Sequence, residues 1–242
     1  MDANLRERNN MPNEHLTPFQ LESASYIYDY PGKGHDKVFA NDILGLYALF
    51  DGAGNDRHSR IAEAYLHGQL EDGHAIDEAS FLDLAVEVNN LPGMGMSAGA
   101  MIHIIGGEII TLNRGDTSIF IDQPGPGFTV LGHEPTTYRG NLIDTKNFFG
   151  YKPTDTKTTH DLMRTTMPTH RQFTVLAVSD GVYDDDGRGA SLDELAAILH
   201  AGRTQTAQLL AQTVFAAIGN LYDDASVLVI KGSYDPDNTI DK

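Results

Sequence analysis

The sequence predicts an α+β fold in which antiparallel sheets carry helices on their outer side. Segments typical of strands and segments typical of helices occur in separate blocks, whereas a doubly wound parallel sheet requires strict alternation. The chain has 242 residues, 40% of them hydrophobic, which is enough for one large core, and its 24 glycines indicate many tight turns. No repeat or linker divides it. We expect one domain over residues 21–232, with a flexible leader over 1–20 and a flexible tail over 233–242.

The first part of the chain reads as strands followed by two helices. Alternating tyrosines over 25–30 are typical of a strand. The apolar run 43–50 stops abruptly at Asp51 and Gly52, as a buried strand does at a turn. Apolar residues at helical spacing then predict helices over 58–70 and 77–91.

The middle of the chain returns to strands. Short runs rich in β-branched residues at 101–105, 108–112 and 117–121 are separated by glycine-containing turns, which predicts hairpins. The pattern over 128–170 is weak, so we expect loops and irregular strands there.

The last part combines two buried strands with two helices. The sequence Ser191-Leu-Asp-Glu194 is a capping box and predicts that a helix begins there and runs to His200. The spacing of apolar residues predicts a further helix over 204–218, and the apolar runs 173–178 and 226–230 predict strands.

Charge and composition exclude several classes of function. The chain carries 34 acidic and 17 basic residues, a net charge of −17 without a basic cluster, which argues against binding nucleic acid or an anionic membrane. The absence of cysteine excludes disulfides, zinc–thiolate sites and thiol catalysis. The N-terminus has no apolar stretch like that of a signal peptide, and the apolar runs are too short to span a bilayer. We therefore expect a cytoplasmic protein; the oligomeric state stays open.

Aspartates stand at the ends of the predicted strands. Asp51 and Asp180 each follow a buried strand and precede a glycine, Asp223 stands just before another strand, and Asp116 lies in a hairpin turn. Asp-Gly is also the commonest turn dipeptide, so each residue alone can be a turn residue. Carboxylates that converge would repel one another unless a divalent ion neutralised them. Oxygen ligands favour Mg²⁺ or Mn²⁺ over zinc, and two such ions could acidify a shared water and direct it at a phosphate.

These segments resemble the motif series of the PPM family, the metal-dependent (type 2C) serine/threonine phosphatases. The resemblance covers about residues 25–230, and its strength lies in the order of the motifs, since each alone is weak. The matching segments and family motifs are Gly34–Val38 with NEDxxxV, Tyr47–Gly54 with FxVFDGHGG, Gly95–Ala98 with GSTA, Leu112–Ser118 with ANVGDSR, Leu176–Asp184 with LASDGLWD and Asp223–Val227 with DNxTV.

The resemblance implies a fold and a set of ligands. The fold would be a sandwich of two antiparallel β-sheets flanked by helices, in α-β-β-α layers, and the substrate a phosphoprotein. Two or three Mn²⁺ or Mg²⁺ ions would bind, and the three main aspartates would be catalytic as well as metal ligands. By this resemblance Asp51 would bridge both main ions, and the carbonyl of Gly52 would bind one of them. Asp180 and Asp223 would hold the other ion. Asp116 would belong to a further, weaker metal site, and Asp36 would lie near the two main ions.

The substrate side of the motifs departs from the family. His35 replaces the metal-binding glutamate, and Pro31 replaces the arginine that binds the substrate phosphate. Ala53 stands where the family often has a histidine that acts as general acid, and Asp224 replaces the asparagine of the last motif. Lys33, Lys37 or Arg57 could take over phosphate binding, although a lysine lacks the bidentate geometry of arginine. The alternative function is therefore a PPM-fold regulatory or binding module with little catalysis.

Two other interpretations fit less well. The acidic run 184–187 fails as an EF-hand calcium loop, because Val182 would stand at the first ligand position. A phosphohydrolase that works through an aspartyl-phosphate needs an Asp-x-Asp pair after the first strand, and Asp51-Gly-Ala does not supply one.

Overall fold

The computed structural model describes residues 19–53, 55–70, 76–91, 95–132, 149, 163–168, 171–183, 189–219, 221 and 223–234. Within them the chain forms two five-stranded sheets, in which each pair of neighbouring strands is antiparallel. The elements in chain order are β1 (Phe19–Tyr28), β2 (Lys37–Asn41), β3 (Leu46–Ala53), α1 (Arg57–Leu70), α2 (Glu78–Asn89), β4 (Met96–Ile105), β5 (Glu108–Arg114), β6 (Ser118–Gln123), β7 (Gly127–Gly132), β8 (Met163–Pro168), β9 (Gln172–Val178), α3 (Leu192–Ala201), the 3₁₀ turn η3 (Gly202–Thr204), α4 (Ala207–Ala216) and β10 (Ala225–Tyr234).

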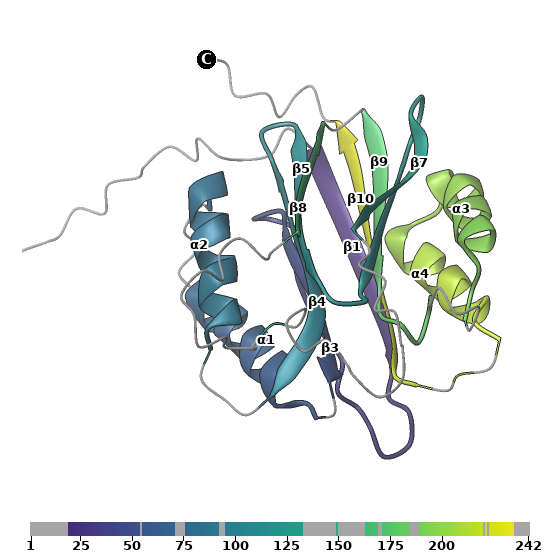
Figure 1. Ribbon diagram of the computed structural model, residues 1–242. Helices are drawn as coiled ribbons and strands as arrows, with labels where there is room; N and C mark the ends of the chain where they lie inside the picture. Colours follow the sequence, from purple (N-terminus) through teal and green to yellow (C-terminus); the bar gives the residue numbers. More distant parts are fainter. Residues whose placement is uncertain are drawn as a thin grey trace, which may run out of the picture.

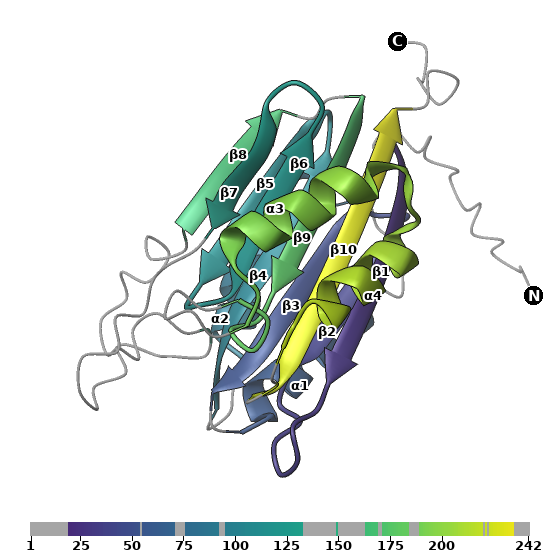
Figure 2. The ribbon, with the colours of Figure 1, turned by 90° about the vertical axis from the view of Figure 1, so that its right-hand side faces the viewer.

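The two sheets pack face to face, and helices cover both outer faces. One sheet has the strand order β1-β10-β9-β6-β7, and the other has the order β2-β3-β4-β5-β8. Helices α1 and α2 lie on the outer side of the second sheet, and α3 and α4 lie on the outer side of the first (Figures 1 and 2). The predicted fold class, an α-β-β-α sandwich, is therefore confirmed.

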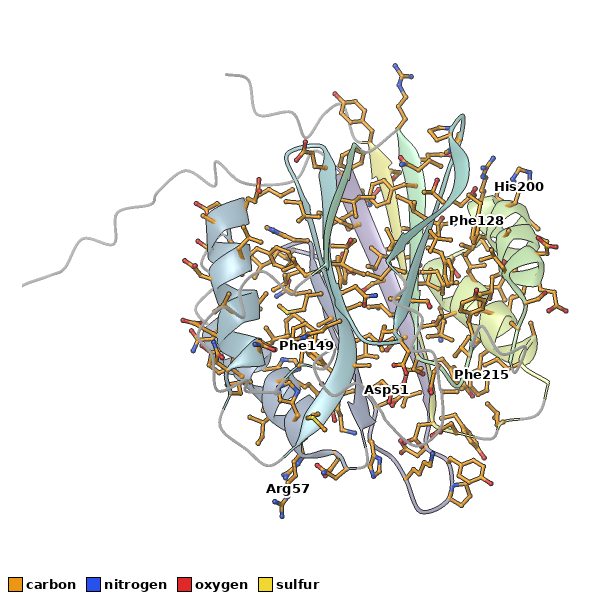
Figure 3. The ribbon with its side chains drawn as sticks, in the orientation of Figure 1. Asp51, Arg57, Phe128, Phe149, His200 and Phe215 are labelled. Atoms are coloured by element: carbon orange, nitrogen blue, oxygen red, sulfur yellow. The ribbon has the colours of Figure 1, made fainter. Side chains whose placement is uncertain are left out.

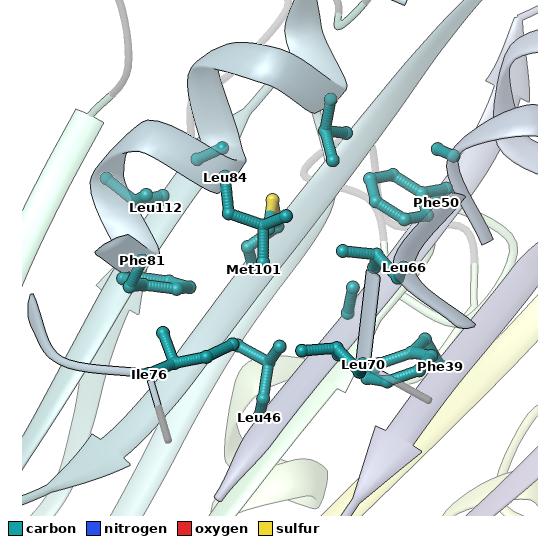
Figure 4. Packing of buried hydrophobic residues seen from close by; sticks show 14 of the residues in the cluster. Phe39, Leu46, Phe50, Leu66, Leu70, Ile76, Phe81, Leu84, Met101 and Leu112 are labelled. Atoms are coloured by element: carbon teal, nitrogen blue, oxygen red, sulfur yellow. The ribbon is translucent and has the colours of Figure 1, made fainter. Parts of the chain in front are cut away.

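Strands buried on both faces explain the uniformly apolar runs in the sequence. In β3, Leu46, Ala48 and Phe50 face the helices α1 and α2, in the cluster drawn in Figure 4. Tyr47 and Leu49 point the other way, into the core between the sheets. Side chains alternate along a strand, so a strand with two buried faces needs apolar residues at every position.

The helices begin and end close to their predicted boundaries, because the residues that cap them can be identified in the sequence. The carboxylate of Asp77 accepts a hydrogen bond from the backbone N–H of Ser80 at the start of α2. The capping box of Ser191 and Glu194 forms at the start of α3. Helix α4 begins at Ala207, after the N-cap Thr206, three residues later than the apolar spacing alone predicted.

Some strands differ from the prediction in length. β1 begins at Phe19, inside the predicted leader, because Phe19 is buried and Leu21 packs in the core between the sheets. β10 continues to Tyr234, paired with β1 along its whole length. Within 128–170 the structure describes β7, Phe149 and β8, and the rest of that range lies outside the described residues, as does the acidic run 184–187. No helix in the described part of the chain is long and apolar enough to cross a membrane.

Candidate metal centre

Five predicted site aspartates come together at one end of the sandwich, because the strand directions place them there. β3 and β5 run the same way, each antiparallel to β4 between them, so Asp51 near the end of β3 and Asp116 after β5 share an edge of the sheet. In the other sheet β9 ends just before Asp180, and the antiparallel β10 begins just after Asp223. Asp51 lies at this end in Figure 3.

Asp51 and Asp180 lie in contact, with a hydrogen bond between their carboxyl groups. Desolvation, followed by the charges of Asp36, Asp180 and Asp116, raises the pKa of Asp51 well above its ordinary value. Burial and the charges of Asp116 and Asp223 raise the pKa of Asp180 to about 7. Two carboxyl groups in contact repel each other when both are ionised, so this pair favours a proton or a cation between them.

Asp36, directly before β2, is a buried carboxyl group. Its side chain is 1% exposed, and neither carboxylate oxygen has a partner in hydrogen-bonding geometry among the described residues. Burial is the main cause that raises its pKa to about 6; the nearby hydroxyls of Ser226 and Ser179 lower the pKa only in part. A buried carboxylate without a partner is costly and calls for a cation or a proton.

Asp223 forms an ion pair with the ammonium group of Lys33. Lys33 Nζ donates to Asp223 Oδ1. Burial lowers the pKa of Lys33, but the hydrogen bond to Asp223 and the charges of Asp223, Asp224 and Asp180 outweigh it and raise the pKa overall. The structure thus places Lys33, predicted to bind phosphate, on a predicted metal ligand.

Asp224 fastens the loop that carries Lys33. Its buried carboxylate accepts hydrogen bonds from the backbone N–H groups of Tyr30 at 2.7 Å, Gly34 at 3.0 Å and His35 at 3.0 Å. The sequence offered Asp224 only as a departure from a family asparagine. Its anchoring role was missed because its partners lie about 190 residues away along the chain.

Gly52 and Gly181, which follow Asp51 and Asp180, stand where neighbouring parts of the chain leave no space for a side chain. A Cβ on Gly52 would lie 2.5 Å from the Cβ of His35 and 2.8 Å from the carbonyl oxygen of Asn55. A Cβ on Gly181 would collide with the carbonyl oxygen of Asp224. The room that these glycines leave is filled by neighbouring loops of the chain.

The remaining predicted residues lie around this centre in different ways. His35 is half-buried against Gly52, and its carbonyl oxygen accepts a hydrogen bond from Ser59 Oγ. Lys37 Nζ donates to the carbonyl oxygens of Asp36 at 2.7 Å and Gly34 at 3.2 Å, so its charge is held within the loop. Arg57 is exposed at the start of α1, and its side chain points away from the molecule in Figure 3.

The residues at this end of the sandwich fit a hard divalent cation. They supply oxygen donors and one imidazole. Among the described residues they include a buried carboxylate whose oxygens have no hydrogen-bond partner, and a pair of carboxyl groups in contact. Such a set suits Mg²⁺ or Mn²⁺. In the part of the chain that the structure describes, no three acidic or histidine side chains are already arranged around one point as a finished cation cage.

A cavity of about 600 Å³ lies at the opposite end of the β1-containing sheet, and it contains none of the predicted site residues. Arg203 binds Asp122 there through two hydrogen bonds, of 2.5 and 2.7 Å. Lys231 donates to backbone carbonyl oxygens of residues 202, 203 and 205. Since both cations are engaged in holding the turn before α4, this cavity is secondary to the acidic end.

Comparisons with known proteins support the fold. The sequence matches no protein-family model and no curated protein. Among solved structures, PppA, a key regulatory component of T6SS in Pseudomonas aeruginosa, matches 90% of this chain over 99% of its own, with a TM-score of 0.69 and 15% identity. The catalytic domain of the serine/threonine phosphatase PstP, solved with two manganese ions, matches 89% of this chain over 99% of its own, with a TM-score of 0.68 and 18% identity.

A third matching structure is described as a phosphatase of the PPM class. The PPM Ser-Thr phosphatase MsPP from Mycobacterium smegmatis matches 88% of this chain over 98% of its own, with a TM-score of 0.60 and 15% identity. The chain therefore has the fold of the metal-dependent serine/threonine phosphatases, as the motif resemblance implied. At these identities the likeness concerns the fold, and the activity is argued from the site.

Proposed function

We propose that this protein is a metal-dependent phosphatase that hydrolyses phosphoserine and phosphothreonine in proteins. One observation carries the proposal: separate strand ends bring Asp36, Asp51 and Asp180 together with raised pKa values, in a fold shared with phosphatases. Titratable groups with strongly shifted pKa values in one place mark a functional site more often than a structural one.

The proposed roles of the residues follow the motif resemblance to the PPM family. Asp51, the carbonyl group of Gly52 and His35 would hold one ion, Asp180 and Asp223 would hold a second, and Asp116 would serve a third, weaker site. Asp36 would supply negative charge beside the first pair. Mn²⁺ or Mg²⁺ bound here would supply Lewis acidity toward a phosphoryl oxygen and a water molecule.

Side chains of the protein would also hold a proton and a positive charge at the proposed reaction centre. Because the pKa values of Asp51 and Asp180 are raised, a proton held on this pair would have to leave before both groups could act as ligands, so metal binding should release protons. Lys33, whose side chain is 39% exposed, is the cation best placed to meet an incoming phosphate. Lys37 and Arg57 are less well placed, since one is held by the loop and the other points outward.

The alternative, a PPM-fold regulatory module with little catalysis, is favoured by one specific observation. The ammonium group of Lys33 occupies an oxygen of Asp223, where a phosphatase of this kind would hold its second ion. A chain that keeps this ion pair permanently could retain the fold and a partner-binding surface without turnover.

Phosphate release from a phosphothreonine peptide with Mn²⁺ tests the proposal. The wild-type protein should release phosphate, and Asp180→Ala and Asp51→Ala should each reduce the rate to background, because each removes a carboxylate from the centre. Wild-type activity no higher than that of Asp180→Ala would contradict the proposal. Tight Mn²⁺ binding in calorimetry without turnover on any phosphoprotein would instead favour the regulatory module.

A further inference from the structure

Lys33 is held in a fixed position over the acidic centre. Its loop makes a turn in which the Lys33 N–H donates to the carbonyl oxygen of Tyr30 at 2.9 Å. Gly32 and Gly34, with φ of +88° and +100°, allow the sharp path that the chain takes on either side of Lys33. The buried carboxylate of Asp224 then clamps both ends of this turn through backbone N–H groups.

The partner of Lys33 is the aspartate next to that clamp. Lys33 Nζ donates to Asp223 Oδ1, and the two side chains are 39% and 29% exposed. Asp223 Oδ1 also accepts the N–H of Asp224 at 2.8 Å, which fixes its orientation. Backbone contacts therefore hold the loop that carries Lys33 and orient the carboxylate of Asp223.

We propose that Lys33 is a tethered counter-cation that competes with a divalent ion for Asp223 and so sets the metal affinity of the centre. The inference rests on the proposed function, since it concerns the same aspartates. An ammonium group and a metal ion repel each other and need the same oxygen lone pairs. Metal binding at Asp223 is therefore opposed by Lys33, whose loop keeps the ammonium group beside the centre.

The test compares Mn²⁺ binding to three variants, each first freed of metal with a chelator. Lys33→Met removes the competing charge with little change in side-chain length, and Lys33→Arg keeps the charge. Arg60→Met is the matched control, because it removes one positive charge from an exposed ion pair with Asp56 on α1. Binding is measured by calorimetry and, independently, from the electron paramagnetic resonance signal of free Mn²⁺.

We expect Lys33→Met to bind Mn²⁺ roughly three- to tenfold more tightly than the wild type, the range for losing one partly shielded opposing charge. Lys33→Arg should stay within about twofold of the wild type because it keeps the positive charge beside Asp223. Arg60→Met should do so because Arg60, on α1, pairs with Asp56 and not with Asp223. The metal-free Lys33→Met protein should also melt at a lower temperature, because the carboxylates lose their counter-charge.

The outcomes separate this inference from the proposed function. If the wild type binds Mn²⁺ and Lys33→Met binds it equally or more weakly, the competition is refuted while the phosphatase proposal stands. Binding by Lys33→Met but not by the wild type supports the competition and contradicts a metal-loaded wild-type enzyme. Binding by neither protein refutes both.

Discussion

Replacing Asp36 by asparagine should stabilise the metal-free protein at alkaline pH. In the folded chain the pKa of Asp36 is raised from 3.8 to about 6, mainly by burial. The native state therefore keeps this proton at pH values where the unfolded chain has lost it. The resulting stabilisation is fully present below about pH 4 and is lost as the pH rises through 6, so ionised Asp36 opposes folding at pH 8.

The size of the effect follows from that shift. Two pKa units at 1.36 kcal/mol each correspond to about 3 kcal/mol of unfolding free energy. Asparagine has nearly the same shape and no charge, so Asp36→Asn should match the wild type near pH 4 and exceed it by about 3 kcal/mol at pH 8. Relief of repulsion on Asp51 acts in the same direction.

Urea denaturation followed by circular dichroism, with a chelator present, measures this difference at both pH values. Asp83→Asn is the matched control, because Asp83 is exposed on α2, and it should change stability by less than about 0.5 kcal/mol at either pH. If Asp36→Asn is no more stable than the wild type at pH 8, or if its advantage is the same at pH 4, the reasoning is wrong.

Three further substitutions test the packing, each by urea denaturation. Gly52→Ala should lower the unfolding free energy by about 1–3 kcal/mol because its Cβ has no room, whereas Gly68→Ala, with open space in α1, should raise it by about 0.5–1 kcal/mol. Equal effects would refute the crowding. Asp224→Ala should cost about 2–4 kcal/mol and speed amide exchange in the loop it clamps; unchanged exchange would contradict the clamp. Arg203→Ala should cost about 2–4 kcal/mol by leaving the buried Asp122 unpaired, and a negligible loss would contradict a structural role.

The sequence was sufficient for elements whose cause is local. Ser191 caps its helix as predicted, because a cap depends on residues three positions apart, and Asp77 caps α2 at the predicted start of that helix. The turn at Gly106 and Gly107 forms with both glycines at positive φ, as the hairpin prediction requires. The extension of β1 back to Phe19 was missed, because it depends on pairing with β10 at the other end of the chain.

The same distinction applies to the candidate site. The aspartates at strand ends were found from sequence because a strand ends visibly where its apolar run stops, and the family resemblance supplied their order. The role of each as a metal ligand stays a prediction. The contacts of Lys33 with Asp223 and of Asp224 with the Lys33 loop depend on long-range pairing, which local patterns do not encode. The reason for the glycines was likewise visible only in three dimensions.

The clamp formed by Asp224 links residues made early and late in synthesis. The loop of Lys33 is made about 190 residues before the aspartates that hold it. β1, next to that loop, also waits for its partner β10. A ribosome-bound chain can therefore assemble much of the second sheet while its acidic end stays open, and contacts of such sequence separation form slowly. The Lys33 loop is therefore clamped only once Asp224 and β10 have been made, so a chain that stops before them should leave this loop unanchored.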